Sequence, residues 1–148
     1  MMTELIVLCG PKGSGKSTWA KNFVLKNPSY YIISEDQVKK TMEKTPEKVD
    51  TFIHMKLYYL LSHGKSVIFD GENLRAKDRY KLIQLFKRIE DIKFTCVGFT
   101  ASLKTCEYRL NNSFPELYSQ FKKFQRPSPV EGWNSISSYK GEYNNDTY

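Results

Sequence analysis

Histidine and cysteine are both scarce in this sequence of 148 residues, and long apolar runs are absent. The two histidines, His54 and His63, are too few for a histidine-based metal site. The three cysteines are odd in number and lack CxxC spacing, which argues against a disulfide framework and a zinc site. No segment approaches the length that spans a bilayer, and no leader pattern opens the chain. We therefore expect a soluble cytoplasmic protein with reduced thiols and no membrane partner.

Acidic residues are fewer than basic ones. Asp and Glu number 16 against 23 Lys and Arg, which gives a formal net charge of +7 and a pI near 9.2. An excess of this sign favours an anionic partner such as a nucleotide or a nucleic acid, although a merely soluble basic surface explains it equally well. The length fits one domain, which we place at residues 1–148.

Short apolar runs alternate with helical patterns along most of the chain. Strands are predicted at 5–9, 30–33, 66–69 and 94–99, and helices at 16–26, 36–43, 49–61, 75–90 and 103–110. This order predicts an α/β fold in which a parallel sheet of four to five strands carries helices on both faces. Ligands of such sheets bind at the carboxyl ends of the strands, where Gly10, Asp36 and Asp70 fall.

The segment GPKGSGKS, Gly10–Ser17, matches the P-loop pattern G-x-x-x-x-G-K-[ST] between a predicted strand and a predicted helix. Its glycines let backbone N–H groups face a phosphate, and the positive end of the helix points at the anion. Lys16 is expected to reach the β- and γ-phosphates and Ser17 to ligate Mg²⁺. We predict a site for ATP and Mg²⁺ formed by Gly10, Lys12, Gly13, Ser14, Gly15, Lys16, Ser17 and Thr18.

The stretch GSGKSTWAKNFVLKNPSYYIISEDQVKK resembles bacteriophage-type polynucleotide 5′-kinases. The shared features are the glycine loop, the KSTWA helix start, the Asn-Pro helix stop and an aromatic second strand followed by an acidic residue. The resemblance implies a P-loop kinase fold with a helical lid and transfer of the ATP γ-phosphate to the 5′-hydroxyl of DNA or RNA. It also implies that Asp36 is the general base, with Glu35 as its neighbouring alternative. A purely structural alternative is that Asp36 caps the next helix.

The same resemblance indicates where the acceptor binds. Three residues after the base the family has an arginine that grips a phosphate, and this chain has Lys39, which keeps the charge but loses the bidentate fork. The stretch VIFDGENL resembles the family's strand-Asp-x-Thr-Asn-Leu element, with Glu72 in place of the threonine. It implies that Asp70, or Gly71 in another register, occupies the position that holds the acceptor hydroxyl or a Mg²⁺-bound water. Asn73 is either a further acceptor-binding residue or a helix cap.

A lid is predicted at about 103–126. The stretch CEYRLNN is similar to the family's lid helix, which implies that Arg109 closes over the transferring phosphate. The family's second lid arginine has no match, because Ser113 stands in its place. Its candidate replacements are Lys122, Lys123 and Arg126.

Three further features carry expectations. Arg79 is expected to have a structural role, and FQRPSPVEGW, 124–133, is similar to a segment of eukaryotic polynucleotide kinases. The polar, tyrosine-rich end at about 138–148 is expected to be a mobile tail. The D-x-D-G-T motif of the phosphatase domains that accompany many such kinases is absent from this sequence, so we expect kinase activity alone.

Two other functions stay open. A small-molecule kinase acting on a nucleoside, sugar or antibiotic hydroxyl would share the P-loop, the base and the lid, and Lys39 is compatible with it. A nucleotide-dependent switch is the other alternative. Two features argue against it: the N-K-x-D motif is absent, and an acidic residue follows the second strand. The expected partner is a 5′-hydroxyl DNA or RNA end, and the resemblance places the protein in the cytoplasm of a phage host.

Overall fold

The structure is a computed structural model and describes residues 2–43 and 45–140. Strands and helices alternate through the first two thirds of the chain, as the sequence predicts. The elements in chain order are β1 (Thr3–Cys9), α1 (Lys16–Lys26), β2 (Tyr31–Ser34), α2 (Glu35–Met42), α3 (Pro46–Ser62), β3 (Val67–Asp70), α4 (Ala76–Phe86), β4 (Ile92–Phe99), α5 (Leu103–Arg109), α6 (Leu117–Lys123), the 3-10 helix η1 (Pro129–Glu131) and β5 (Ser135–Tyr139).

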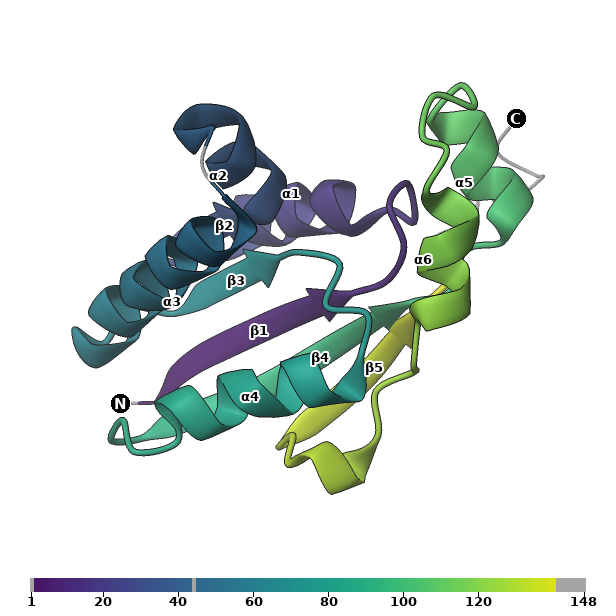
Figure 1. Cartoon of the computed structure of the whole chain (residues 1–148). Coiled ribbons are helices and arrows are strands. Elements are labelled where there is room, and N and C mark those ends of the chain that lie inside the picture. The colour runs from purple at the N-terminus through teal and green to yellow at the C-terminus, as the bar shows by residue number, and fades with distance from the viewer. Residues whose placement is uncertain (1, 44, 141–148) are drawn as a thin grey trace.

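Strand β1 lies at the centre of a single sheet (Figure 1). Within the described residues the sheet has five strands in the order β2-β3-β1-β4-β5, and every neighbouring pair is parallel. The sequence TELIVLC is buried along almost its whole length, which only a strand covered on both faces achieves. The parallel direction gathers the carboxyl ends of the strands at one edge, where β1 leads into the P-loop and β3 ends at Asp70. The predicted α/β fold is confirmed.

Side chains of β1 alternate between two cores. Leu5 and Val7 belong to the larger core, which α3 and α4 cover, and Ile6 and Leu8 belong to the smaller core beneath α1. The four core residues of α3 follow helical spacing: Val49, Ile53, Leu57 and Leu61. Helices cover both faces of the sheet and make it rigid. The sheet therefore fixes the positions of the polar residues at the strand ends.

The structure differs from the prediction most clearly after residue 110. The sequence prediction lacks α6, η1 and β5, because short elements with few apolar residues leave no periodic pattern. β5 pairs with β4 although Ile136 is its one strongly apolar side chain. Residues 138 and 139 therefore belong to a strand and not to the predicted tail, and residues 141–148 lie outside the described residues. The helix predicted at 75–90 is shorter in the structure, where α4 spans Ala76–Phe86.

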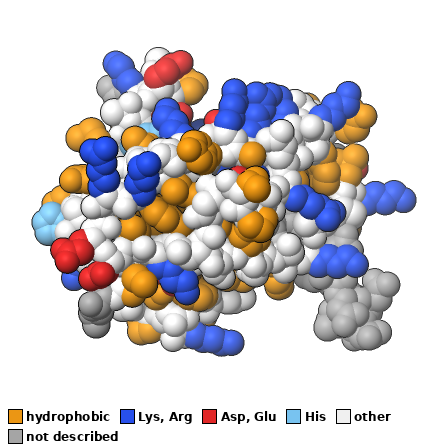
Figure 2. Space-filling view, turned by 90° about the horizontal axis from the view of Figure 1, so that it is seen from below, with side chains coloured by type: hydrophobic (Ala, Val, Ile, Leu, Met, Phe, Trp, Pro, Cys, Tyr) orange, Lys and Arg blue, Asp and Glu red, His pale blue; other side chains and the backbone are white. Residues whose placement is uncertain are grey.

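Charged side chains are spread over the face shown in Figure 2. Several Lys and Arg side chains lie along the upper edge of this face, and few acidic side chains are visible beside them. Part of the basic excess counted in the sequence is therefore displayed on this face. In the part of the chain that the structure describes, no helix is both long and apolar enough to cross a membrane.

Candidate active site

The loop between β1 and α1 forms a cradle because its glycines adopt backbone angles that other residues avoid. Gly13 and Gly15 have φ angles of 82° and 103°. A Cβ on Gly10 would lie 2.9 Å from the Phe99 carbonyl oxygen, and one on Gly13 would lie 3.1 Å from the Cys106 carbonyl oxygen. Side chains at these positions would therefore displace the loop. The loop leads directly into α1, whose first N–H groups lack intrahelical partners and suit an anion.

Lys16 supplies a buried positive charge at the cradle. The residue is only 8% exposed, and its Nζ donates to the carbonyl oxygens of Gly10 and Pro11 at 2.7 and 3.0 Å. Burial lowers the pKa of the Lys16 ammonium, while the nearby carboxylates of Glu72 and Asp70 act in the opposite direction. The structure thus places the predicted phosphate-binding lysine inside the loop.

A pocket of about 500 Å³ lies against the loop, a size suited to a small-molecule ligand. In the same loop, Ser14 is fully buried, and its Oγ has no hydrogen-bond partner among the described residues. A glycine cradle, a buried lysine and an unpaired buried hydroxyl together fit a bound phosphate chain. The predicted site residues that line this pocket are Lys12, Gly13, Gly15, Lys16, Ser17, Thr18, Asp36, Asp70 and Arg109.

Ser17 and Asp70 join α1 to the end of β3. The Ser17 hydroxyl donates to Asp70 Oδ2 at 2.7 Å. Burial raises the pKa of Asp70, and the hydrogen bond from Ser17 and the charge of Lys16 counteract that rise. A hydroxyl and a carboxylate are oxygen ligands of the kind that Mg²⁺ takes, so this pair fits the predicted metal. Of the two registers left open for the acceptor-binding aspartate, Asp70 is the one that brings a carboxylate to the pocket.

Asp36 lies in the first turn of α2, directly after β2. The cap of this helix is Ser34, whose Oγ accepts from the Gln37 N–H at 3.3 Å, so the alternative that Asp36 caps the helix is wrong. The Asp36 side chain is 44% exposed and lines the pocket, with Oδ2 3.9 Å from Lys12 Nζ. A hydroxyl entering the pocket can therefore reach this carboxylate.

A second pocket, of about 530 Å³, adjoins the first, and Glu72 lines both. Helix α2 contributes to each of them, because Asp36 lines the first pocket and Lys39, one turn later, lines the second. Asn73 also lines the second pocket. The lining of the second pocket carries charges of both signs. Its basic side chains are Lys39, Arg75, Lys77, Lys81 and Lys123, and its acidic ones are Glu35, Asp50, Glu72 and Asp78.

A pair of carboxyl groups lies between the two pockets, and the sequence does not predict it. Burial and a hydrogen bond with Glu72 raise the pKa of Glu35 to about 8. Burial also acts to raise the pKa of Glu72, but the bond from Glu35 and the charges of Lys16 and Lys39 bring it below its ordinary value. Lys39 Nζ lies 3.8 Å from Glu35 Oε1. The pair therefore holds one proton near neutral pH. In the sequence, the one indication of this pair is Glu72, which stands where the family has a threonine.

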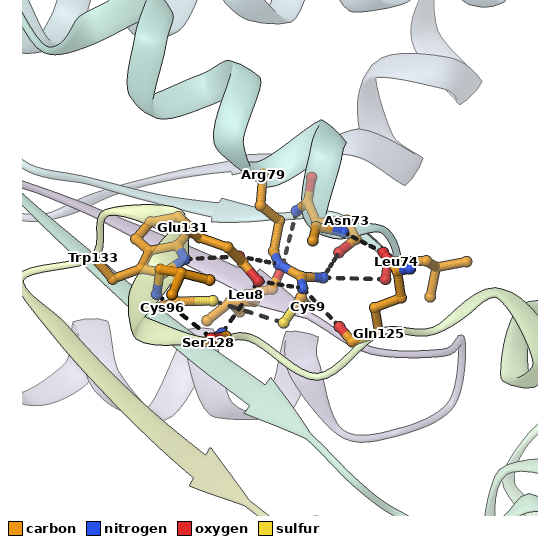
Figure 3. A network of polar contacts seen from close by, with 12 residues as sticks. Leu8, Cys9, Asn73, Leu74, Arg79, Cys96, Gln125, Ser128, Glu131 and Trp133 are labelled. Carbon is orange, nitrogen blue, oxygen red and sulfur yellow. Dashed lines mark hydrogen bonds and ion pairs between the residues drawn. The ribbon is translucent and has the colours of Figure 1, made fainter.

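The loop between β3 and α4 is held by Arg79, which is fully buried and lies beside it (Figure 3). Its Nη1 donates to the carbonyl oxygens of Asn73 and Leu74 at 2.7 and 3.1 Å. Its Nε and Nη2 contact the Glu131 carboxylate at 2.9 and 3.0 Å. Nη2 also donates to the Gln125 carbonyl oxygen at 2.7 Å. The expected structural role of Arg79 is confirmed.

Two further hydrogen bonds fasten the same loop to the P-loop strand. The Gly10 N–H donates to the Glu72 carbonyl oxygen at 2.9 Å, and the Asn73 side-chain amide donates to the Leu8 carbonyl oxygen at 2.8 Å. Asn73 does not cap α4, because the cap position is Arg75 and carries no side-chain cap bond. The alternative capping role of Asn73 is therefore wrong.

Helices α5 and α6 stand beside the P-loop at the carboxyl edge of the sheet (Figure 1). Arg109, the last residue of α5, lines the first pocket and donates from Nη1 to the Gly13 carbonyl oxygen at 3.1 Å. The Gln120 side chain of α6 accepts from the Lys12 N–H at 2.8 Å. The predicted lid segment is thus in direct contact with the phosphate cradle.

The structure does not bring Arg126 into either pocket. Arg126 is exposed and lines neither pocket, and the Gln125 N–H next to it donates to the Leu74 carbonyl oxygen at 2.8 Å. Lys123, another candidate for the missing lid arginine, lines the second pocket.

Comparison with known proteins identifies a family for this chain. Residues 5–112 match the family described as AAA domain. The chain belongs to this family. The matched range of this AAA domain protein includes the P-loop, Asp36, Asp70 and Arg109.

Individual relatives give a closer view of this AAA domain. A protein of Acanthamoeba polyphaga mimivirus, whose provisional name is bifunctional polynucleotide phosphatase/kinase, is 34% identical over 84 residues. The match covers 57% of this chain and 18% of that relative, so the chain spans about a fifth of its length. The predicted resemblance of this sequence to polynucleotide kinases is thus confirmed.

Solved structures share the fold. A fungal RNA kinase superposes with a TM-score of 0.75 and 15% identity, over 100% of this chain and 78% of that chain. A gluconokinase from Sinorhizobium meliloti superposes with a TM-score of 0.60 and 17% identity, over 92% of this chain and 82% of that chain. The fold is therefore that of P-loop kinases, a group whose members phosphorylate unlike acceptors.

Proposed function

We propose that this protein is a polynucleotide 5′-hydroxyl kinase that transfers the γ-phosphate of ATP to the 5′-hydroxyl of DNA or RNA. The observation that carries the proposal is the placement of α2 across both pockets, with Asp36 in the first and Lys39 in the second. A hydroxyl next to the cradle and a phosphate beside Lys39 would then be held by one rigid element. We take 1–148 as one kinase unit with its lid at 103–126.

The chemistry assigned to Asp36 is proton transfer. Its carboxylate accepts the proton of the acceptor hydroxyl as the oxygen attacks the γ-phosphorus, the bond between that phosphorus and the β,γ-bridging oxygen breaks, and ADP leaves. Lys16 and Arg109, which both line the pocket, hold the transferring phosphate. The remaining cradle residues, from Gly10 to Thr18, bind the phosphate chain through backbone N–H groups and hydroxyls.

The metal proposed for this site is Mg²⁺, held by Ser17, with Asp70 binding a metal-bound water or the acceptor hydroxyl. Bound Mg²⁺ neutralises charge that develops on the phosphate oxygens. Lys39 and Asn73 are assigned to the acceptor, since both line the second pocket. The basic residues around that pocket suit a phosphodiester backbone.

A second candidate is a kinase for a small-molecule hydroxyl. One contact favours it: Lys39 is within 3.8 Å of Glu35, so the residue assigned to an acceptor phosphate already faces a carboxyl group. An acceptor without a flanking phosphate would not need that lysine to be free.

The deciding experiment is transfer of labelled γ-phosphate from Mg²⁺-ATP. The acceptors are 5′-hydroxyl DNA and RNA oligonucleotides, 3′-nucleotides, free nucleosides and gluconate. Label on oligonucleotides and 3′-nucleotides alone supports the proposal; label on nucleosides or gluconate alone overturns it in favour of the second candidate.

Asp36→Asn tests the assignment of the base. The amide keeps the shape but cannot take the proton, so transfer should fall by about 10²–10⁴ while ATP binding stays. Asp91→Asn, an exposed change of the same kind, is the matched control. Turnover by Asp36→Asn at the control's rate would remove Asp36 as base.

A further inference from the structure

The first pocket continues beyond the phosphate cradle along α1, where its lining becomes aromatic. Trp19, Phe23 and Tyr139 line it there, together with polar residues of α1. None of these three rings lines the second pocket. The aromatic part of the cavity therefore belongs to the nucleotide side of the site and not to the acceptor side.

The rings in this part of the pocket are fixed by a buried support. Phe99, at the end of β4, is fully buried and contacts the ring of Tyr139, at the end of β5, with centroids 5.5 Å apart at 62°. The same Phe99 ring meets Trp19 edge-on, with centroids 6.3 Å apart at 82°. Trp19 in turn stacks on Phe23 at 5.1 Å. The rings are thus oriented by the core.

Tyr139 nevertheless keeps 49% of its surface exposed. Its backbone is held by the β4–β5 pairing and by a hydrogen bond of 3.1 Å from the Thr100 N–H to its carbonyl oxygen. A half-exposed aromatic ring held in place inside a ligand pocket offers a flat face at little entropic cost. Aromatic faces in such positions stack on nucleobases.

We infer that Tyr139 and Trp19, which both contact the Phe99 ring and line the first pocket, form the base subsite of the nucleotide pocket, where the nucleobase of the phosphate donor stacks on the Tyr139 ring. The inference rests on the proposed nucleotide-binding function and adds to it the residues that hold the base. A base in that position leaves its triphosphate directed toward the cradle, because both regions line one continuous pocket. The opposite side, at Glu72, stays open for the acceptor.

The test compares Mg²⁺-ATP with Mg²⁺-tripolyphosphate, which has the phosphate chain but no base, by isothermal titration calorimetry. Tyr139→Ala should weaken ATP binding about tenfold, equivalent to about 1.4 kcal/mol, and leave tripolyphosphate binding unchanged. Tyr139→Leu, which keeps apolar packing on Phe99 without an aromatic face, should give the same selective loss. Tyr80→Ala, at a tyrosine of α4 that is also 49% exposed, is the matched control.

Each outcome has one meaning. A loss confined to ATP supports the base subsite. Equal affinities for ATP and tripolyphosphate, or unchanged ATP affinity in both Tyr139 variants, would overturn the subsite while leaving the phosphate cradle intact. Failure of the unchanged protein to bind either ligand would instead refute the proposed nucleotide-binding function itself. Intrinsic fluorescence gives an independent readout, since ATP should alter Trp19 emission and Trp19→Phe should abolish that change.

Discussion

Replacing Glu131 by Gln should destabilise the protein strongly. Glu131 Oε1 accepts from Arg79 Nε and from the Trp133 indole N–H, each at 2.9 Å. Oε2 accepts from Arg79 Nη2 at 3.0 Å and from the Ser128 N–H at 3.1 Å. All four contacts come from donors, so either orientation of a glutamine amide would set its NH₂ group against two of them. The fully buried Arg79 would also lose its counter-charge. Removing one partner of a buried ion pair costs about 3–5 kcal/mol.

Urea unfolding measures this cost. With a slope of about 1–3 kcal/mol per molar urea for a domain of this size, the midpoint should fall by about 2 M. Glu90→Gln, an exposed change of the same chemistry, should stay within about 0.5 kcal/mol of the unchanged protein. The double variant Arg79→Leu/Glu131→Leu should be less destabilised than the sum of its single variants, since it buries no unpaired charge. A loss below about 1 kcal/mol for Glu131→Gln would refute the reasoning.

Two further predictions concern the loop and the carboxyl pair. Gly13→Ala should weaken ATP binding in calorimetry, because Gly13 has a φ of 82° and its added Cβ would lie 3.1 Å from the Cys106 carbonyl oxygen. The control Gly64→Ala, at a φ of 75° with open space around it, should cost about 1–2 kcal/mol of stability and leave ATP binding unchanged. Equal ATP affinity in both variants would show that the cradle tolerates a side chain. Because the pKa of Glu35 is raised to about 8, the folded protein binds more protons than the unfolded chain between about pH 5 and 8, so its stability should fall across that window by at most about 1.4 kcal/mol per pH unit. Glu35→Gln should flatten this profile in urea titrations at several pH values, and parallel profiles would contradict the assignment.

The part of the site nearest the strands could be predicted from the sequence. Gly10 and Asp70 lie at the ends of apolar runs, and Asp36 follows another in the first turn of the next helix. A parallel sheet brings such positions to one edge whatever its strand order, so strand recognition alone was enough. The same argument located Lys16 and Ser17, because the loop motif fixes their spacing from the first strand.

The rest of the site depends on contacts that no local pattern records. Glu35 and Glu72 meet because β2 and β3 are neighbours, which the chain order of the strands does not reveal. The sequence offers Arg126 as one of three candidates for the second lid residue, yet Arg126 lines neither pocket. Tyr139 lies in a strand whose residues are mostly polar, so the hydrophobic pattern of this segment does not distinguish a strand from a polar tail.

The order in which the segments are synthesised gives the Arg79–Glu131 pair a further consequence. A ribosome releases the chain from its N-terminus, so the P-loop leaves the tunnel before the rest of this domain. Arg79 emerges 52 residues ahead of Glu131, and β1 lacks its neighbour β4 until residue 99 has been made. Until Glu131 has been made, Arg79 lacks the counter-charge that holds it against the β3–α4 loop. A nascent chain therefore carries the whole phosphate motif well before it can hold the β3–α4 loop against it.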